Sequence, residues 1–379
     1  MEPRVFLGRE KELNTFCAQL EKAGNNYYNH SIVLGDWGIG KTTLLKEYRK
    51  IAQTQGILTS FVSVREYTGR ELLTPAVQLI TQIPRGLPIK FERIKSFVKY
   101  LNGLGITFPV IGGGIQLASK QKYQGDPQVL LLDALLRLWN ELKKEMETVI
   151  VLLDDVQNYK IVPEFLTLLK NVLSDEEIVK GTGYLFGLSS THKGWSQFMQ
   201  KHHPIGRYFI PIVRLKNLSK EKVFEIVDKT LDTTGVVFEA DVREAVFEYT
   251  EGHPFQLQIL CDYLYESQVE GVVKIDSFDS SLDKTLEDLG EIILEHLYEL
   301  ASNTEKKVLR IMAEHYRTNV FNDLLTFCPR YGMTKGTLGK SLSRLVNKGL
   351  VMKKQRGMFR LPNRIFAEYI LRVEEIWHS

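Results

Sequence analysis

One stretch of the sequence holds residues whose types and spacing suit the binding of a phosphate group. It fits the pattern G-x-x-x-x-G-K-[ST] without a gap. Glycines allow successive backbone N–H groups to turn towards phosphate oxygens, and a helix that starts there directs its positive end at the anion. Lys41 would reach the β- and γ-phosphates, and the Thr42 hydroxyl would be a ligand of Mg²⁺. The residues expected to bind the nucleotide here are Gly35, Asp36, Trp37, Gly38, Ile39, Gly40, Lys41, Thr42 and Thr43.

The residues around this stretch supply the context that the pattern needs. An apolar run with β-branched residues, Ser31–Leu34, precedes it, and a run with helical character, Thr42–Ala52, follows it. The alternative is a glycine-rich turn between a strand and a helix, with a surface lysine. The strand-to-helix context favours the nucleotide, so the sequence predicts a site for ATP or ADP with Mg²⁺.

A second stretch carries two carboxylates at the end of an aliphatic run. Asp154 and Asp155 close the sequence VIVLLDD. A carboxylate at the carboxyl end of a buried strand, beside a phosphate loop, is placed to bind Mg²⁺ and its waters. We expect Asp154 to hold the metal together with Thr42, and Asp155 to orient or deprotonate the attacking water. The alternative is that the two acids cap the following helix.

The elements that position these residues alternate between strand and helix over the first two hundred residues. The apolar runs are continuous, which indicates strands covered on both faces, in a parallel sheet flanked by helices. The predicted fold class is α/β, a P-loop NTPase sheet. The expected strands are Gly56–Val64, Thr148–Asp155, Gly183–Ser190 and Arg207–Val213, and the expected helices include Glu71–Gln82 and Pro127–Met146.

Between residues 83 and 123 the alternation breaks. This segment holds Pro84, Pro88, Pro109 and a triplet of glycines at 112–114. It could be a structural insertion such as a hairpin, a mobile lid or a partner-binding element, and the sequence leaves these interpretations open.

The second part of the chain is expected to be helical from Ser219 to Leu300. Three helical segments follow, Thr304–His315, Val320–Phe327 and Thr334–Asn347, and then an alternating stretch turns at Arg356-Gly357. Three helices and a hairpin form a winged helix-turn-helix. The predicted domains are a P-loop ATPase core at 1–216 with an insertion at 83–123, an all-helical lid at 217–300 and a C-terminal winged helix at 301–379.

The order of these motifs resembles one family over nearly the whole chain. An opening FLGREKEL box, the phosphate loop, the aspartate strand, a strand ending in Ser189-Ser190, and Gly252-His253-Pro254 before a helix stand in sequence, with the winged helix last. Together they resemble the archaeal-type ATPases of the STAND class of AAA+ proteins, related to origin-recognition replication initiators. The phosphate loop and the aspartate strand are the most specific of these motifs.

The resemblance implies roles for further residues. Phe6, Leu7, Gly8 and Arg9 would line the adenine pocket, and Ser189 or Ser190 would sense the γ-phosphate; Ser190 is taken as the candidate. Arg207 would be an arginine finger that acts on a neighbouring subunit, and His253 and Pro254 would contact the nucleotide from the lid. Each also has an ordinary structural alternative, such as a helix start, a turn serine or a solvated arginine. Two departures stand out: the helix after Pro254 has no arginine, and the winged helix has no MHD triad.

Charge is distributed unevenly along the chain. The net charge is +3, but the segment 330–364 has ten Lys or Arg and no Asp or Glu. A basic segment on an otherwise acidic chain suggests a polyanionic partner, and a winged helix suggests double-stranded DNA. The residues expected to contact DNA are Thr337, Lys340, Ser341, Arg344, Lys348, Lys353, Lys354 and Arg356. The alternative is that the winged helix docks a protein partner.

Composition excludes several classes of protein. With 44% hydrophobic and 25% charged residues, and no apolar run near the roughly 18 residues of a membrane span, the sequence predicts a soluble globular protein, and its few cysteines favour the reducing cytoplasm. The N-terminus lacks the pattern of a secretory signal. Three scattered cysteines argue against disulfides or zinc, and His192, His202 and His203 lack neighbours at ligand spacing. The family resemblance implies a monomer when ADP is bound, with ATP-dependent self-assembly as an open possibility.

Overall fold

The chain forms two compact units. The computed structural model describes residues 5–25, 27–106, 123–202, 207–316 and 320–378. One unit is Arg9–Lys216, and the other is Asn217–Ser379 together with a short N-terminal segment that includes Gly8. Each unit is built around a hydrophobic core of its own.

The first unit contains a five-stranded parallel sheet, as predicted. Its strands are β1 (His30–Leu34), β2 (Leu58–Ser63), β3 (Val149–Asp154), β4 (Tyr184–Ser190) and β5 (Phe209–Arg214). Their order across the sheet is β2-β3-β4-β1-β5, and all four pairings are parallel. Every residue of β3 and β4 is buried. Because parallel strands end at the same edge, this order brings the carboxyl ends of β3, β4 and β1 side by side.

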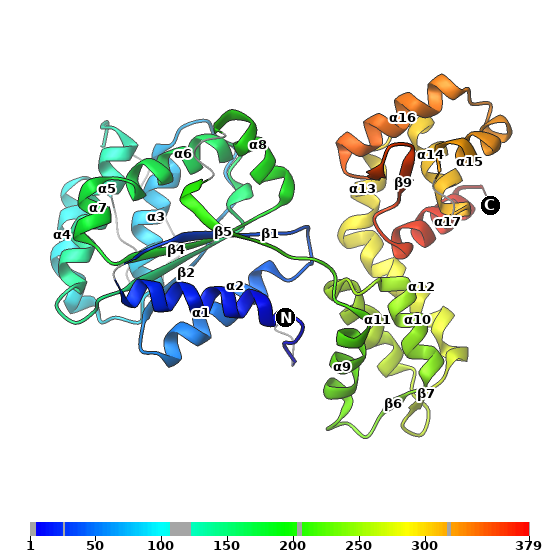
Figure 1. Ribbon diagram of the computed structural model, residues 1–379, viewed down its shortest axis with the longest axis horizontal. Helices are drawn as coiled ribbons and strands as arrows, with labels where there is room; N and C mark the ends of the chain where they lie inside the picture. Colours follow the sequence, from blue (N-terminus) through cyan, green and yellow to red (C-terminus); the bar gives the residue numbers. More distant parts are fainter. Residues whose placement is uncertain (1–4, 26, 107–122, 203–206, 317–319, 379) are drawn as a thin grey trace. The chain divides into compact units, whose positions relative to one another are not determined.

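Helices cover both faces of the sheet. In Figure 1, α1 and α2 lie on one face, and α5, α6 and α8 lie on the other. The unit's helices are α1 (Glu10–Gly24), α2 (Lys41–Thr54), α3 (Leu73–Gly86), α4 (Lys95–Gly103), α5 (Pro127–Leu142), α6 (Val162–Leu173), α7 (Glu176–Gly181) and α8 (His192–His202). The α/β fold class predicted from the continuous apolar runs is confirmed.

The segment at 83–123 is helical where the structure describes it. Residues 83–86 are the last turn of α3, and a 3-10 turn (Phe91–Ile94) then leads into α4. Phe97, Leu101 and Ile106 are buried in the core of the first unit. The segment thus begins as packed core structure, not as a hairpin, while Pro109 and the glycine triplet lie outside the described residues.

The second unit begins with helices, broken by one short pairing of strands. The helices are α9 (Lys220–Leu231), α10 (Ala240–Thr250), α11 (Pro254–Glu266) and α12 (Phe278–Leu289), and a π turn (Gly290–Leu294) joins α12 to α13 (Glu295–Glu299). The prediction of helices alone is wrong here, because β6 (Val237–Phe238) pairs in parallel with β7 (Val272–Val273). Strands of two residues are too short to leave a periodic pattern in the sequence.

Three helices and a hairpin follow in the same unit. They are α14 (Asn303–Glu314), α15 (Phe321–Phe327), α16 (Lys335–Lys348), and the antiparallel strands β8 (Met352–Gln355) and β9 (Met358–Arg360), before a last helix, α17 (Arg364–His378). A capping box between Ser302 and Glu305 starts α14. One continuous core runs from Leu218 to Ile370, so the helices that begin the unit and the region after α14 pack as one body.

Candidate nucleotide site

The phosphate loop lies between β1 and α2 and is held open by its backbone conformation. Gly40 has φ 100° and directly precedes α2, a conformation that a residue with a Cβ adopts only under strain. The Leu44 N–H donates to the Gly40 carbonyl at 2.9 Å, so the helix begins at the lysine of the motif. The Gly35 N–H donates to the Ser190 carbonyl at 3.2 Å, which ties the start of the loop to β4. The first N–H groups of α2 have no acceptor within the helix, so they are available as donors to an anion bound in the loop.

Lys41 is buried within this loop. Only 7% of it is exposed, and its ammonium donates to the Asp36 carbonyl at 3.2 Å. The same Nζ lies 3.9 Å from Oδ1 of Asp155. The lysine is therefore held between the loop backbone and the end of β3, where a phosphate oxygen can replace either contact.

Asp154 joins three elements of the site. It is 4% exposed; its Oδ2 accepts from the Thr42 hydroxyl at 2.8 Å, and its Oδ1 accepts from the Ser189 hydroxyl at 2.6 Å. Burial raises the pKa of the Asp154 carboxyl, and the hydrogen bond from Ser189 opposes that rise. The α2, β3 and β4 ends thus converge on one carboxylate.

This arrangement fits a magnesium ion. The Thr42 hydroxyl and the Asp154 carboxylate are hard oxygen donors, the ligand type that Mg²⁺ prefers, and they already lie 2.8 Å apart next to the phosphate loop. One or two protein ligands plus phosphate oxygens are a usual environment for this ion. The predicted metal ligands are therefore brought together by the fold.

Asp155 is held in an unusual backbone conformation. Its φ and ψ are 58° and 52°, the left-handed region, which costs energy for a residue with a Cβ but is more often tolerated by Asp than by most. Its N–H donates to the Ser189 hydroxyl at 2.8 Å, and its Oδ1 accepts from Nε2 of Gln157 at 2.8 Å. The side chain remains 36% exposed, which leaves it open to a water.

The serine that contacts the aspartates is Ser189, not Ser190. Ser190 is fully buried, and its hydroxyl has no hydrogen-bond partner within the described residues. A Cβ built on Gly194 would come 2.9 Å from that hydroxyl, so Ser190 faces the start of α8. The contact with Asp154 is therefore made by Ser189, and the role of Ser190 as a sensor of the γ-phosphate stays a prediction. The alternation of side chains along β4 sends the two serines to opposite faces.

Arg9 connects the phosphate loop to the last residue of the first unit. One guanidinium nitrogen donates to the Ile39 carbonyl at 3.0 Å and the other to the Lys216 carbonyl at 2.8 Å. Burial lowers the pKa of Arg9, while Glu12 and Glu10 oppose that effect. Phe6, Leu7 and Gly8 are half-buried residues of the second unit, where Gly8 lies beside Leu218.

Comparison with known protein families finds a match for most of the first unit. Residues 5–181 match the family model of the AAA ATPase domain. Residues 5–181 therefore carry an AAA ATPase domain, and the protein is a P-loop ATPase. The resemblance to AAA+ ATPases predicted from the order of the motifs is therefore confirmed.

Two solved structures are similar in fold over nearly the whole chain. A Walker-type ATPase of Pyrococcus abyssi is 17% identical, with 97% of each chain covered and a TM-score of 0.62. The ORC2 protein of Aeropyrum pernix, solved as ADPNP-ADP complexes, is 18% identical, with 100% of this chain and 97% of that chain covered and a TM-score of 0.59. At such identities the likeness concerns the fold.

A curated relative was also found. It is an uncharacterized HTH-type transcriptional regulator of Methanocaldococcus jannaschii, 20% identical over 373 residues, which cover 93% of the ATPase and 85% of the relative.

The remaining candidate residues for nucleotide contact do not bond to Lys41, Asp154 or Asp155 in any contact described above. In the first unit, Arg207 is exposed, and its guanidinium carbon lies 5.5 Å from the centre of the Tyr208 ring. In the second unit, His253 directly precedes α11 and Pro254 is its first residue, so the helix starts as the sequence predicts. Trp37 is 44% exposed at the loop, and Thr43 is half-buried in α2.

The residues expected to contact DNA differ in burial and in the contacts that they already make. Ser341 is only 4% exposed, so the prediction that its side chain faces DNA is wrong. Lys348 is already paired inside the second unit: its ammonium donates to Oε2 of Glu305 at 2.5 Å and to the Leu300 carbonyl at 2.8 Å. The Thr337 side chain contacts the hydroxyl of Thr334 at the start of α16. Lys340, Arg344, Lys353, Lys354 and Arg356 are exposed, and so is Lys348, although its ammonium is bound to Glu305.

Two arginines of the basic segment also form ion pairs within the second unit. Arg360 pairs with Glu251, and Arg364 pairs with Glu248 while its guanidinium lies 3.8 Å from the centre of the Tyr249 ring. Part of the positive charge counted in the sequence is therefore paired with acidic side chains of the second unit.

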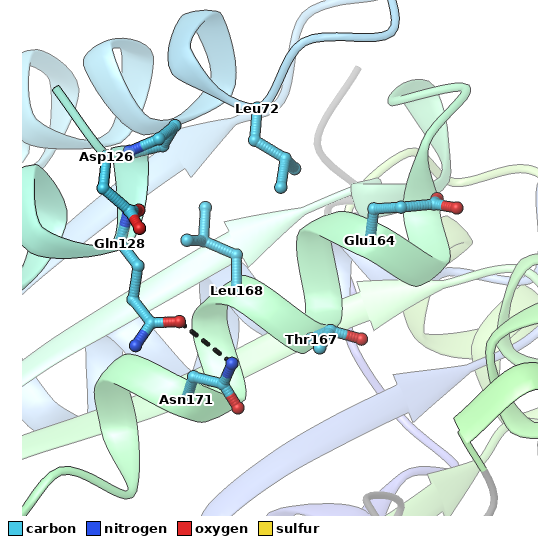
Figure 2. Close-up of a pocket in the computed structure, with 8 residues that line it drawn as sticks. Leu72, Asp126, Gln128, Glu164, Thr167, Leu168 and Asn171 are labelled. Atoms are coloured by element: carbon cyan, nitrogen blue, oxygen red, sulfur yellow. Dashed lines mark hydrogen bonds between the residues drawn. The ribbon is translucent and has the colours of Figure 1, made fainter.

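Other features of the ATPase lie away from this site. A cavity of about 260 Å³ opens between the start of α5 and one side of α6, next to Leu72, and at its edge Oε1 of Gln128 accepts from Asn171 at 2.9 Å (Figure 2). None of the helices that the structure describes is long and apolar enough to cross a membrane. Within the same residues, no group of three or more His, Cys, Asp or Glu could hold a metal ion. His203 lies outside the described residues, and His192 is exposed.

Proposed function

We propose that the chain is a STAND-type switch, an ATPase whose nucleotide state positions a basic C-terminal winged helix, and that this winged helix binds double-stranded DNA. The observation that carries the proposal is the convergence of the Lys41 ammonium, the Thr42 hydroxyl and the carboxylates of Asp154 and Asp155 at one edge of the sheet. These are the charges that the triphosphate and its metal require.

Each of these groups has a distinct task in hydrolysis. Lys41 balances charge on the β- and γ-phosphates, and the α2 amides bind their oxygens. Thr42 and Asp154 would hold Mg²⁺, which neutralises charge that develops on the transferred phosphoryl group. Asp155 orients the attacking water and accepts its proton. The Ser189 hydroxyl donates to the Asp154 carboxylate and accepts from the Asp155 backbone N–H, so both acids are positioned before the nucleotide arrives.

The proposed domains give the switch its moving part. Residues 217–300 are proposed as the lid, with His253 and Pro254 in contact with nucleotide, and residues 301–379 as the winged helix. Because one core spans both, we expect the lid and the winged helix to respond to nucleotide as one body. The Aeropyrum relative was solved with ADPNP and with ADP, which supports the binding of both nucleotides in this fold.

Five exposed cations support DNA as the partner. Lys340 and Arg344 lie on α16, and Lys353, Lys354 and Arg356 lie on the hairpin. In a winged helix these elements would meet the major groove and the adjacent phosphates. The curated relative is named as an HTH-type regulator, which favours the same partner class.

One observation favours the alternative, a winged helix that docks a protein. Lys348, Arg360 and Arg364 are bound to acidic side chains of the second unit. The free positive surface is therefore smaller than the sequence suggests, and a surface of this size also suits an acidic protein partner.

Two measurements test the proposal. Isothermal titration should detect ATP in the presence of Mg²⁺, and Lys41→Ala should weaken that binding at least tenfold; equal binding by both proteins would reject the site. Fluorescence anisotropy with a duplex should show an affinity that falls steeply between about 50 and 200 mM salt. If the affinity for duplex DNA changes with neither salt nor nucleotide, and the protein binds an acidic protein instead, the alternative is favoured.

A further inference from the structure

Gln157 contacts the candidate base from the turn that follows β3. Its Nε2 donates to Oδ1 of Asp155 at 2.8 Å, and its Oε1 accepts from the Thr191 N–H at 3.1 Å. Gln157 is half-buried, and the 3-10 turn Val156–Asn158 carries it. The side chain therefore bridges the end of β3 and the start of α8.

The two hydrogen bonds fix the orientation of the amide. The Thr191 backbone offers only a donor, so the carbonyl oxygen of Gln157 must face it. The amide nitrogen then faces Asp155, whose ionised carboxylate only accepts. Flipping the amide would place two acceptors together on one side and two donors on the other, so this orientation is the stable one.

Both contacts to the Asp155 carboxylate fall on the same oxygen. Gln157 binds Oδ1, and the Lys41 ammonium lies 3.9 Å from the same atom. Within the part of the chain that the structure describes, Oδ2 of Asp155 has no hydrogen bond. The carboxylate is thus oriented so that one oxygen is occupied by the protein and the other is open to a water.

The start of α8 packs closely against Gln157. A Cβ built on Gly194 would come 3.0 Å from Cβ of Gln157, and the Gly194 N–H donates to the Thr191 hydroxyl at 3.1 Å. A glycine at this position therefore lets the first turn of α8 approach and hold Thr191 where it meets the amide. The amide of Gln157 has little room to leave Asp155 without moving this turn.

We propose that Gln157 is a positioning residue for hydrolysis, which turns Asp155 so that Oδ2 receives the attacking water. The proposal rests on the role of Asp155 in the proposed function. Gln157 would not touch the nucleotide, and we expect its loss to change the rate of hydrolysis without changing the affinity for nucleotide.

The test compares variants that keep the shape of residue 157 but alter its hydrogen bonds. Gln157→Met retains the length of the side chain without either hydrogen bond, and Gln157→Glu places an acceptor against Asp155. Both should lower kcat by about ten- to hundredfold, the cost of a misplaced catalytic group, with the Kd for ADP within twofold of the parent. Gln128→Met is the matched control, because Gln128 binds Asn171 at the edge of the distant cavity (Figure 2), and it should leave kcat unchanged.

Asp155→Asn separates this proposal from the proposed function. If Asp155→Asn retains the parent kcat, the role of Asp155 is wrong and the inference falls with it. If Asp155→Asn abolishes turnover while Gln157→Met leaves kcat intact, the proposed function stands and the inference is overturned. In the Asp155→Asn background, Gln157→Met should have no further effect on the residual turnover measured at high enzyme concentration, and an additive loss there would also overturn the inference.

Discussion

The guanidinium of Arg360, at the end of β9, pairs with the carboxylate of Glu251, which directly follows α10. The Tyr316 hydroxyl donates to the same carboxylate, and the backbone carbonyl of Glu251 accepts from Asn217 at 3.0 Å. Glu251 has φ 48°, so the chain turns sharply just before His253 and Pro254. This contact connects the hairpin to the turn that we propose as the nucleotide-responsive part of the lid, and also to the first residues of the second unit.

Arg360→Met should destabilise the second unit without removing an exposed cation. The Glu251 side chain is 21% exposed and would lose its charged partner, at a cost of about 1–2 kcal/mol in the free energy of unfolding. Urea denaturation measures this. Arg356→Met, on the turn side of the same hairpin, is the matched control: it should leave stability unchanged but weaken binding to duplex DNA. A stable Arg360→Met protein with weak DNA binding would reverse these assignments.

Lys348→Met and Lys340→Met, on the same helix, should have opposite consequences. Glu305 is 2% exposed, and Lys348 is its charged partner, so removing Lys348 leaves a buried carboxylate with only the hydrogen bond from the Ser302 N–H among the described residues. We expect a loss of about 3 kcal/mol in the free energy of unfolding for Lys348→Met and almost none for Lys340→Met. In anisotropy titrations, Lys340→Met should reduce the salt dependence of DNA binding by about one unit in the log–log slope. An unchanged slope for Lys340→Met would remove α16 from the proposed interface.

The sequence predicts the catalytic cluster because the patterns that identify its residues each lie within one short stretch of the chain. Lys41 and Thr42 follow from one contiguous pattern, and Asp154 follows from its place at the end of an aliphatic strand. The parallel sheet then brings both to one edge. The contact between Lys348 and Glu305 joins residues 43 positions apart, and no local pattern predicts it. The burial of Ser341 was available from the helical period, since it lies three residues after Leu338 and four before Leu345, which both belong to the core.

The choice between Ser189 and Ser190 needed the register between strands. Leu153 of β3 lies opposite Leu188 of β4, so the next residues, Asp154 and Ser189, are neighbours on the same face. A register shifted by one residue would have paired Asp154 with Ser190, and the sequence carries no signal that excludes this. Gln157 was missed for a related reason: its two partners are backbone and carboxylate groups brought together by the end of β3 and the start of α8.

The structure predicts different effects for these two serines. Ser189→Ala removes the hydrogen bond to Oδ1 of Asp154 and the acceptor for the Asp155 N–H, so kcat should fall by about ten- to hundredfold. Ser190→Ala removes a buried hydroxyl that has no partner within the described residues, and kcat should stay within about twofold of the parent. Steady-state ATPase assays at saturating ATP compare the two. A larger loss for Ser190→Ala would mean that β4 shifts its register when nucleotide binds.

His30 gives the first unit a dependence on pH that is separate from catalysis. It begins β1, where its Nδ1 accepts from the Phe186 N–H at 3.1 Å, and burial lowers its pKa from 6.5 to about 4. Between these pH values the unfolded chain binds a proton that the folded chain excludes, so stability rises with pH and is lost as the pH falls from about 6.5 towards 4. At pH 5 the contribution of His30 amounts to a loss of about 2 kcal/mol relative to pH 7.5.

His30→Asn should remove this pH dependence, because Asn keeps an acceptor near the position of Nδ1 and cannot be protonated. The free energy of unfolding, measured with urea at pH 7.5 and at pH 5, should fall by about 2 kcal/mol less in His30→Asn than in the parent. His192, which is exposed on α8, offers the control, since His192→Asn should leave the difference between the two pH values unchanged. If the parent and His30→Asn lose the same stability on acidification, the neutral, hydrogen-bonded imidazole at the start of β1 is ruled out as the cause.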